Sequence, residues 1–294
     1  MAKTIIEASE LIINGDGSCF HLHLKPGEIA DNIILVGDPG RVDMIAGYLT
    51  DITVRAENRE FRSVTGKYNG KPLTVCSTGI GTDNIDIVVN ELDALVNVDF
   101  KTRTVKDEHH TLNFVRIGTS GSLQPELEVG CWLLSESAIG FDGLLNFYAN
   151  RRSVTDNDFE EAFKKYMDWN PLLTSPYVVD AAPSLISKLK DSKSINLGVT
   201  ISAPGFYGPQ GRVIRLQIAD PAINTKITNF RYNGRKITNY EMECSAIYGL
   251  SKLLGHNAAT VCAIIANRKA GNSNADYKPS IRALIEHVLE SLSK

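Results

Sequence analysis

The chain has 294 residues, of which 43% are hydrophobic and 22% are charged, and its formal net charge is −3. This balance is typical of a soluble globular protein and excludes the strongly basic composition of many nucleic-acid-binding domains. No apolar run approaches the roughly 18 residues of a membrane-spanning helix. We therefore expect small-molecule partners, and neither nucleic acid nor a membrane.

The five cysteines are scattered along the chain and never form a C-x-x-C pair. Several of them lie inside apolar stretches, which favours reduced, buried thiols over a disulfide framework or a zinc site. The N-terminal segment lacks the apolar core of a signal peptide. These features predict a cytoplasmic protein.

Short apolar runs alternate with helix-like stretches along the chain. In chain order, the pattern predicts a strand over 33–36, a helix over 41–49, a strand over 73–77, a helix over 83–96, strands over 113–117 and 131–135, a helix over 178–189, a strand over 195–201, a helix over 241–254, a strand over 258–266 and a final helix over 281–292. Continuous apolar strands separated by helices indicate an α/β fold whose sheet is covered on both faces. We interpret 101–111 and 141–176 as surface segments.

Three glycine-rich turns directly follow predicted strands, at Gly37–Arg41, Thr78–Thr82 and Gly118–Gly121. Glycine lets the backbone approach a ligand closely, and the N-terminus of a following helix attracts anions. Arg41 adds a cation, and Arg116 lies inside an apolar strand, where its charge must be paired or face a polar pocket. We expect the turns to converge at one edge of the sheet as an anion site. Tight turns with a surface arginine, or an Arg116 paired with a buried carboxylate, are the alternatives.

Two further stretches carry candidate ligand-binding groups. Glu241 and Glu243 flank Met242 at the start of a predicted helix, where they either cap the helix or bind paired hydroxyls such as those of a ribose. The loop 205–212 is either a surface turn or a site where Phe206, Gln210 and Arg212 hold a planar heterocycle.

Histidines offer weaker signals. His109 and His110 are adjacent in a polar segment, which we interpret as a solvated loop and not as metal ligands. We assign no metal from the sequence. His21 is a lone histidine near one end of the chain, and by itself it is either structural or functional.

Taken together, these stretches resemble the nucleoside phosphorylase family, and within it the uridine phosphorylase branch. The residues that carry the resemblance are F-H-L at 20–22, G-D-P-G-R at 37–41, N-R-E-F at 58–61, C-S-T-G-I-G at 76–81, R-I-G-T-S-G at 116–121, F-Y-G-P-Q-G-R at 206–212, N-Y-E-M-E at 239–243 and I-A-N-R at 265–268. Each motif is weak alone, and the ordered set is specific. The resemblance weakens over 101–111, which looks inserted, and over about 142–195.

The resemblance implies one domain over residues 1–294, with a mixed, partly barrel-like central sheet flanked by helices. It implies a pentosyl transfer, the phosphorolysis of uridine or deoxyuridine to uracil and the sugar 1-phosphate. Inorganic phosphate is then a co-substrate and no cofactor is needed. The family assembles as homodimers or trimers of dimers with shared active sites.

The resemblance also assigns residue roles, matched motif by motif. The expected phosphate-binding residues are Gly37, Arg41, Arg59 from a neighbouring subunit, Arg116 and Thr119. The expected ribose-binding residues are His21 from the neighbour, Glu241, Met242 and Glu243. The expected base-binding residues are Phe206, Gln210, Arg212 and Arg268. The expected catalytic residues are Arg41, Arg116, Arg212 and Glu243.

Two departures bear on specificity and metals. Purine-specific relatives place an acidic residue after the strand that corresponds to 258–266, whereas this chain reads A-N-R-K at 266–269, without an acid, and carries the Q-G-R loop at 210–212. This favours uracil. Some relatives bind potassium at an interface, where Glu60 and Ile80 match but Asn84 replaces a serine, so the metal is left unassigned. A purine nucleoside phosphorylase, a nucleosidase and a non-catalytic nucleoside-binding protein are the alternatives.

Overall fold

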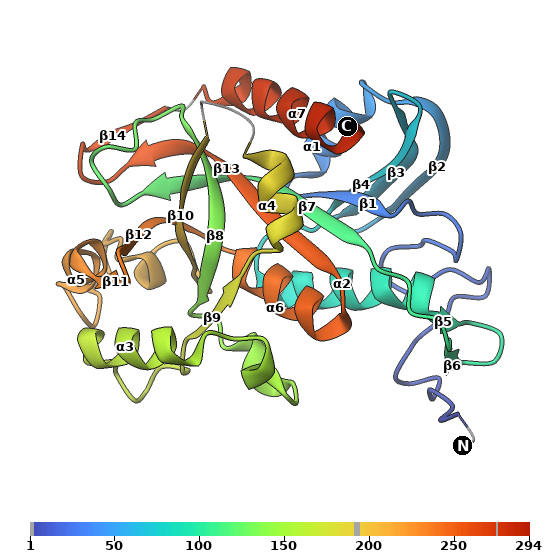
Figure 1. The fold of residues 1–294 in the computed structure, drawn as a ribbon, viewed down its shortest axis with the longest axis horizontal. Coiled ribbons are helices and arrows are strands. Elements are labelled where there is room, and N and C mark those ends of the chain that lie inside the picture. Colours follow the sequence, from blue (N-terminus) through green and yellow to red (C-terminus); the bar gives the residue numbers. More distant parts are fainter. Residues whose placement is uncertain (1–2, 191–194, 275) are drawn as a thin grey trace.

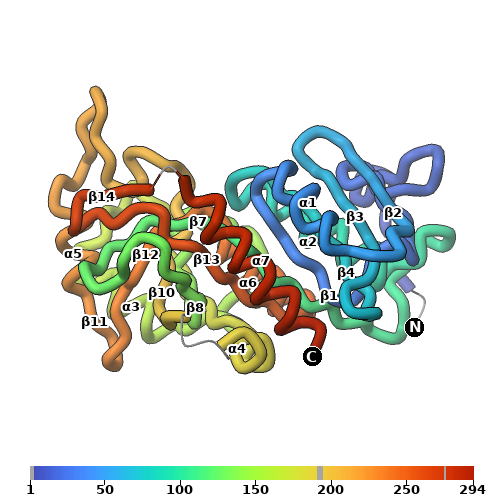
Figure 2. Tube along the Cα trace, turned by 90° about the horizontal axis from the view of Figure 1, so that it is seen from above, coloured from blue at the N-terminus to red at the C-terminus, as the bar shows by residue number. Residues whose placement is uncertain are grey.

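The computed structural model describes residues 3–190, 195–274 and 276–294, and in these residues a large mixed sheet is covered by helices on both faces (Figures 1 and 2). The strands of this sheet are β1 (Asn32–Val36), β2 (Thr50–Asn58), β3 (Phe61–Tyr68), β4 (Lys71–Ser77), β7 (Asn113–Ser122), β8 (Trp132–Gly140), β9 (Tyr177–Asp180), β10 (Ile195–Ser202), β11 (Arg231–Tyr232), β12 (Arg235–Glu241), β13 (Asn257–Asn267) and β14 (Asn272–Ser273). The short strands β5 (Val98–Asp99) and β6 (Thr104–Val105) form a separate pair.

The helices fill the connections between the strands. The α-helices are α1 (Pro39–Ala46), α2 (Thr82–Asn97), α3 (Asn157–Met167), α4 (Pro183–Leu189), α5 (Ile223–Asn229), α6 (Cys244–Leu254) and α7 (Lys278–Ser293), and the 3-10 turns are η1 (Leu144–Phe147), η2 (Arg151–Ser153) and η3 (Gly208–Gln210). No helix of the described ranges is both long and apolar enough to cross a membrane.

Part of the sheet closes on itself. Strand β7 pairs with β13, β13 with β8, β8 with β10, β10 with β12, and β12 pairs again with β7. On the other side of β7, the strands β1, β4, β3 and β2 extend the sheet as an open wing. The predicted mixed, partly barrel-like sheet is therefore confirmed.

Two apolar layers hold the helices against the sheet. Helices α2 and α6 pack on one face through buried residues such as Val88, Leu92 and Ile247. Helices α1, α4 and α7 cover the other face, where Val42 and Leu289 are fully buried or nearly so. Figure 1 shows α7 above the sheet and α2 and α6 below it. Central strands such as β1 and β13 are thus buried on both faces, which explains their uninterrupted apolar sequences.

The turn between β1 and α1 follows from its residues. Asp38 caps α1, because its carboxylate accepts a hydrogen bond from the Gly40 amide at 2.9 Å, and Pro39 fits the first helical turn. Gly37 lies against the neighbouring turn, where a side-chain carbon would come within 3.3 Å of the Gly79 carbonyl oxygen. The glycine therefore allows two strand ends to lie close together.

The predicted strands are all present, but some helix assignments were wrong. The predicted helix over 178–189 is strand β9 followed by helix α4, because Pro183 begins a helix and disfavours helical geometry at the preceding residue. The helix predicted from Glu241 begins at Cys244, and Glu241 ends β12 instead. The segment 141–176, interpreted as surface, contains helix α3, whose Phe159 and Phe163 are buried.

Candidate active site

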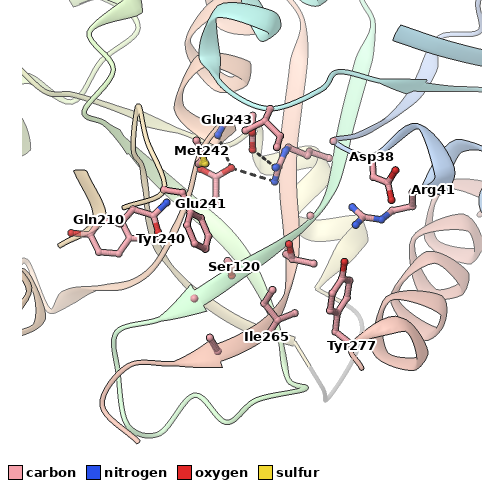
Figure 3. Close-up of a pocket in the computed structure, with 18 of the residues that line it drawn as sticks. Asp38, Arg41, Ser120, Gln210, Tyr240, Glu241, Met242, Glu243, Ile265 and Tyr277 are labelled. Carbon is pink, nitrogen blue, oxygen red and sulfur yellow. Dashed lines mark hydrogen bonds and ion pairs between the residues drawn. The ribbon is translucent and has the colours of Figure 1, made fainter. Parts of the chain in front are cut away.

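A cavity of about 1030 Å³ opens where the ends of β1, β4 and β7 meet the junction between β12 and α6 (Figure 3). Its lining includes Gly37, Gly79 and Gly118, one residue from each glycine-rich turn. The predicted convergence of the three strand ends is therefore confirmed. The sequence-predicted residues that line the cavity are Gly37, Arg41, Arg116, Thr119, Phe206, Gln210, Arg212, Glu241, Met242 and Glu243.

Arg116 forms an ion-pair cluster with two buried carboxylates. Its Nη1 lies 3.2 Å from Oε2 of Glu241, and its Nη2 contacts Oε2 of Glu243. Burial alone would lower the pKa of Arg116, but the carboxylates of Glu243 and Glu241 outweigh burial and raise it. The arginine is therefore a permanent cation, and the predicted alternative in which it pairs with a buried carboxylate is confirmed.

The two carboxylates have different partners. Glu241 accepts hydrogen bonds from the backbone amides of Glu243 and Cys244, both at 2.9 Å, and so caps helix α6. Burial is the main reason that the pKa of Glu241 rises to about 7, and the negative charge of Glu243 adds to it. Glu243 instead accepts a hydrogen bond from the Gly81 amide at 2.8 Å. Capping thus applies to Glu241, while Glu243 connects α6 to the turn before α2.

Arg41 lies at the other side of the same end of the cavity. It is 8% exposed, and its Nη1 donates to the Ile117 carbonyl oxygen at 3.1 Å. Within the described residues no carboxylate lies at ion-pairing distance from it, and burial followed by the positive charge of Arg116 lowers its pKa. Two neighbouring buried guanidinium groups, one of them lacking an anionic partner, form a site with affinity for an anion.

A second pair of arginines meets at Gln210, at the opposite end of the cavity: Arg212 lines the cavity, and Arg268 lies outside the lining and contacts Gln210. The Gln210 amide oxygen accepts hydrogen bonds from Arg212 at 2.5 Å and from Arg268 at 3.0 Å. Arg212 stacks on the Phe206 ring at 3.8 Å, and Arg268 lies over the Tyr240 ring at 4.9 Å. Burial, then repulsion from Arg212, lowers the pKa of Arg268 to about 10. In the described chain neither arginine has a carboxylate partner, so this end also favours negative charge.

Three predicted site residues are absent from the cavity lining. Arg268 contacts the lining residue Gln210, whereas His21 and Arg59 lie away from the cavity and next to each other. The Asn58 side chain donates to the His21 carbonyl oxygen at 2.9 Å, which places the β2–β3 turn beside His21. Arg59 is exposed at that turn, with a left-handed φ of 55°. Both residues expected to reach a neighbouring subunit therefore occupy one surface.

Sequence reasoning missed several residues that line the cavity. Ser120 is 4% exposed and its hydroxyl has no hydrogen-bond partner among the described residues. Tyr240 forms part of the wall, and Tyr277 lies beside Arg41 (Figure 3). Ser120 lies inside the R-I-G-T-S-G motif and Tyr240 inside N-Y-E-M-E, so position within a motif was the available signal. Tyr277 follows β14 and carries no local signal.

One cluster of side chains has the composition of a metal site. The ligand atoms of Asp93, His109 and His256 lie within 4.8 Å of one another. His256 Nδ1 accepts a hydrogen bond from the Leu112 amide, so its proton is on Nε2, 3.1 Å from Asp93. A nitrogen that carries a proton cannot bind a metal. The cluster therefore holds the 101–111 segment against α2 and α6 by hydrogen bonds.

The potassium position of some relatives also differs here. Glu60, Ile80 and Asn84 all line the edge of the cavity. The Asn84 amide nitrogen, however, donates to the Ile80 carbonyl oxygen at 3.4 Å, so this carbonyl is engaged by a side chain. The metal stays unassigned.

Comparison with known proteins places this geometry in a family. The phosphorylase superfamily profile matches residues 31–292. A uridine phosphorylase from Thermococcus kodakarensis is 30% identical, covering 88% of this chain and 83% of the relative. A guanosine phosphorylase from Halorubrum lacusprofundi is 28% identical, covering 86% of this chain and 85% of the relative.

Solved structures agree. A Trypanosoma brucei nucleoside phosphorylase, described as showing uridine phosphorylase activity, superimposes with a TM-score of 0.87 at 30% identity, covering 96% of this chain and 99% of that chain. Both the sequence profile and this fold cover nearly all of the chain, including every strand end around the cavity. The chain belongs to the phosphorylase superfamily.

Proposed function

We propose that the protein cleaves uridine by phosphorolysis, giving uracil and ribose 1-phosphate, with inorganic phosphate as co-substrate and no other cofactor. Deoxyuridine is a further candidate substrate. The observation that carries the proposal is the pairing of an anion-seeking end of the cavity, at Arg41 and Arg116, with Glu243 between it and the cationic base end. Uridine phosphorylases among the relatives, and the nucleoside phosphorylase from T. brucei, support the same reaction.

Phosphate occupies the end with Arg41, Arg116, Thr119 and the Gly37 turn. A bound dianion gives Arg41 the partner that it lacks and draws Arg116 toward the phosphate. Glu243 and Met242 then hold the ribose, whose hydroxyls donate to the Glu243 carboxylate, with Glu241 supporting it from the α6 cap. Holding phosphate beside C1′ makes the attack effectively unimolecular.

The reaction needs charge stabilisation at both ends. As the glycosidic bond breaks, the sugar gains oxocarbenium character beside the phosphate dianion, and the bonding electron pair moves to uracil. Arg212 and Gln210 then face the negative charge on the uracil oxygens, with Phe206 against the ring, and Arg268 adds its positive charge through its hydrogen bond to Gln210. These donors bind the leaving group more tightly in the transition state than in the ground state, which is what accelerates the step. Phosphate forms its bond to C1′, and uracil takes a proton from solvent.

A purine is disfavoured because the stretch 266–269, where purine-specific relatives have an acid, contains none. Asn267 is 2% exposed, and its amide nitrogen donates to the carbonyl oxygens of Gln124 and Leu127. Its amide oxygen accepts from Lys269 and Ala270. With all its hydrogen-bonding capacity used in the turn, Asn267 offers no proton to a purine base.

We also propose that the enzyme is a cytoplasmic homodimer, or a trimer of dimers, with active sites shared between subunits. The exposed surface that carries His21 and Arg59 supports sharing, because neither side chain lines its own cavity. His21 would meet the ribose 5′-hydroxyl and Arg59 the phosphate of the neighbour. The five free cysteines fit a reducing compartment.

The test is incubation of the purified protein with uridine, with and without phosphate, followed by chromatography for uracil. Inosine runs in parallel. Uracil that appears only with phosphate is the expected result. Uracil without phosphate would make the protein a nucleosidase, hypoxanthine would make it a purine enzyme, and no product from either nucleoside would leave a binding protein.

A further inference from the structure

We infer that Glu91 is a positioning residue, which fixes the tautomer and the direction of His21 for the active site of a neighbouring subunit. The inference rests on the proposed function, in which His21 meets the ribose 5′-hydroxyl. Glu91 lies in the middle of α2, is 8% exposed, and does not line the cavity. Its carboxylate is engaged by the His21 segment, so we expect Glu91 to act on the reaction through His21.

The Glu91 carboxylate is surrounded by donors from the His21 segment. Its Oε1 lies 2.6 Å from Nδ1 of His21. Both carboxylate oxygens also accept from the His21 backbone amide at 3.1 Å, and Oε2 accepts from the Leu22 amide at 2.9 Å. One side chain thus holds the backbone and the ring of the same histidine. If Glu91 only capped the loop, its contacts with the backbone amides would be enough, and the contact with the imidazole ring would not be needed.

This geometry determines which ring nitrogen carries the proton. An ionised carboxylate only accepts hydrogen bonds, so the proton of the contact lies on Nδ1. In the neutral imidazole, Nε2 is then an acceptor, and it has no partner within the described ranges of the chain. The His21 side chain is 26% exposed, so Nε2 is accessible. An accessible acceptor is the group that a ribose 5′-hydroxyl, acting as donor, requires.

The surroundings also restrict the ring. The Phe20 ring contacts the imidazole edge to face with centroids 4.8 Å apart, and Phe61 does so at 6.3 Å. Burial, with the adjacent Glu91 carboxylate, raises the pKa of the Cys19 thiol well above its ordinary value, so this thiol stays neutral. Glu91 is thus the charged group that orients His21 in this environment.

The kinetic test compares uridine with 5′-deoxyuridine, which lacks the hydroxyl that His21 would bind, at saturating phosphate. Glu91→Gln replaces the acceptor that holds Nδ1–H by an amide whose nitrogen can donate to Nδ1 and reverse the tautomer. We expect the KM for uridine to rise roughly 3- to 10-fold, with a smaller change in kcat and no change for 5′-deoxyuridine. Glu91→Asp, which keeps the charge, should show a smaller loss that is again confined to uridine.

The chain offers a matched control. Glu160 is also a buried carboxylate, 3% exposed, and it accepts from the Val178 amide at 3.1 Å and from Arg151 at 2.9 Å, away from the cavity. Glu160→Gln should affect the two substrates equally or not at all. An equal loss on both substrates for Glu91→Gln would overturn the inference and leave Glu91 with a purely structural role.

A second measurement does not depend on activity. Nitrogen NMR of histidine-labelled protein reports the tautomer of each imidazole, and His21→Gln assigns the His21 signals by their loss. We expect Nδ1–H in the wild type and the opposite tautomer in Glu91→Gln. An Nε2–H tautomer in the wild type would overturn the inference. If the wild type fails to cleave uridine, the proposed function falls, and the NMR result still decides whether Glu91 sets the tautomer.

Discussion

The two ends of the cavity attract negative charge in different ways. At the phosphate end, Arg116 is buried at a strand and held by the carboxylates of Glu241 and Glu243. At the base end, Arg212 is half-buried in a loop, stacks on Phe206, and has no carboxylate partner among the described residues. The arginine of the phosphate end therefore belongs to the buried core, whereas the arginine of the base end lies in a loop outside the core.

Because of this difference, substitutions at the two ends should affect the free energy of unfolding differently. Removing Arg116 from the phosphate end leaves the buried carboxylates of Glu241 and Glu243 unpaired, which typically costs about 3–5 kcal/mol. Removing a charge from the base end exposes a loop to water and relieves the repulsion between two arginines. Variants of the two ends should therefore change activity and stability in different proportions.

The largest effect is expected at the phosphate end, where two arginines differ in their partners. Arg116→Ala and Arg41→Ala should each lower kcat/KM for phosphate by at least about 100-fold, because each removes charged hydrogen bonds to the dianion. Only Arg116→Ala should also lower the free energy of unfolding, by about 3–5 kcal/mol, because only Arg116 neutralises Glu241 and Glu243. Kinetics over a phosphate series and urea unfolding measure both quantities.

Equal stability losses for these two variants would contradict the ion-pair account. Near-wild-type turnover by folded Arg41→Ala would remove Arg41 from the phosphate site. Because Arg116→Ala is expected to be less stable, the phosphate assignment is judged on Arg41→Ala at a temperature where both proteins are folded.

The buried carboxylate predicts a pH dependence of stability at the same end. Burial raises the pKa of Glu241 from its ordinary 4.5 to about 7. Between these values the folded chain keeps a proton that the unfolded chain has lost, so the stabilising contribution is complete below pH 4.5 and disappears as the pH rises through 7. Relative to Glu241→Gln, the wild type should lose up to about 3 kcal/mol across this window.

Urea unfolding at a series of pH values tests this dependence. Arg212→Ala is the control, because it changes the base end and should keep the wild-type slope. A Glu241→Gln protein with the same pH slope as the wild type would mean that Glu241 is ionised throughout the window.

Substitutions at the base end should lower kcat/KM and leave the free energy of unfolding nearly unchanged. Arg212→Ala removes a charged hydrogen bond to the leaving uracil and should lower kcat/KM for uridine by roughly 10- to 150-fold, or about 1.5–3 kcal/mol. The exposed Arg215 lies in the same loop outside the cavity, so Arg215→Ala is the matched control. Equal activity of the two variants on uridine would exclude Arg212 from base recognition.

The comparison also explains what the sequence could predict. The phosphate end is built from short contiguous motifs, in which an apolar strand runs directly into glycines and an arginine, as at Gly37–Arg41. Such motifs are visible without knowing the fold. Strand β2, in contrast, is mostly exposed and polar, and its pairing with β3 gave no apolar pattern to detect. Helix α3 has the buried residues Phe159, Phe163 and Met167 at helical spacing, but its flanks are irregular.

Contacts between residues far apart in the chain could not be predicted from the sequence. Tyr277 lines the cavity beside Arg41, although the two residues lie at nearly opposite ends of the chain. Glu91 meets His21 across 70 positions of the chain, through a helix that showed only an amphipathic pattern. The sequence showed Glu241 and Glu243 as a pair, and only their partners in three dimensions distinguish the helix cap from the carboxylate that faces Arg116.

The smallest expected effect tests whether the phosphate end of each cavity is completed by a neighbouring subunit. Arg41 lines its own cavity, whereas Arg59 lies on the exposed surface beside His21. In a dimer of Arg41→Ala and Arg59→Ala chains, the cavity of the Arg59→Ala chain keeps Arg41 and receives an intact Arg59 from its partner, so one site of the two is complete. After random exchange half of the dimers are mixed, and the mixture should recover about a quarter of wild-type activity.

Exchange is verified by native mass spectrometry of differently labelled chains. If mixed dimers form and activity stays at the level of the separate variants, Arg59 acts within its own subunit or not at all, and each cavity would have to be complete on one chain.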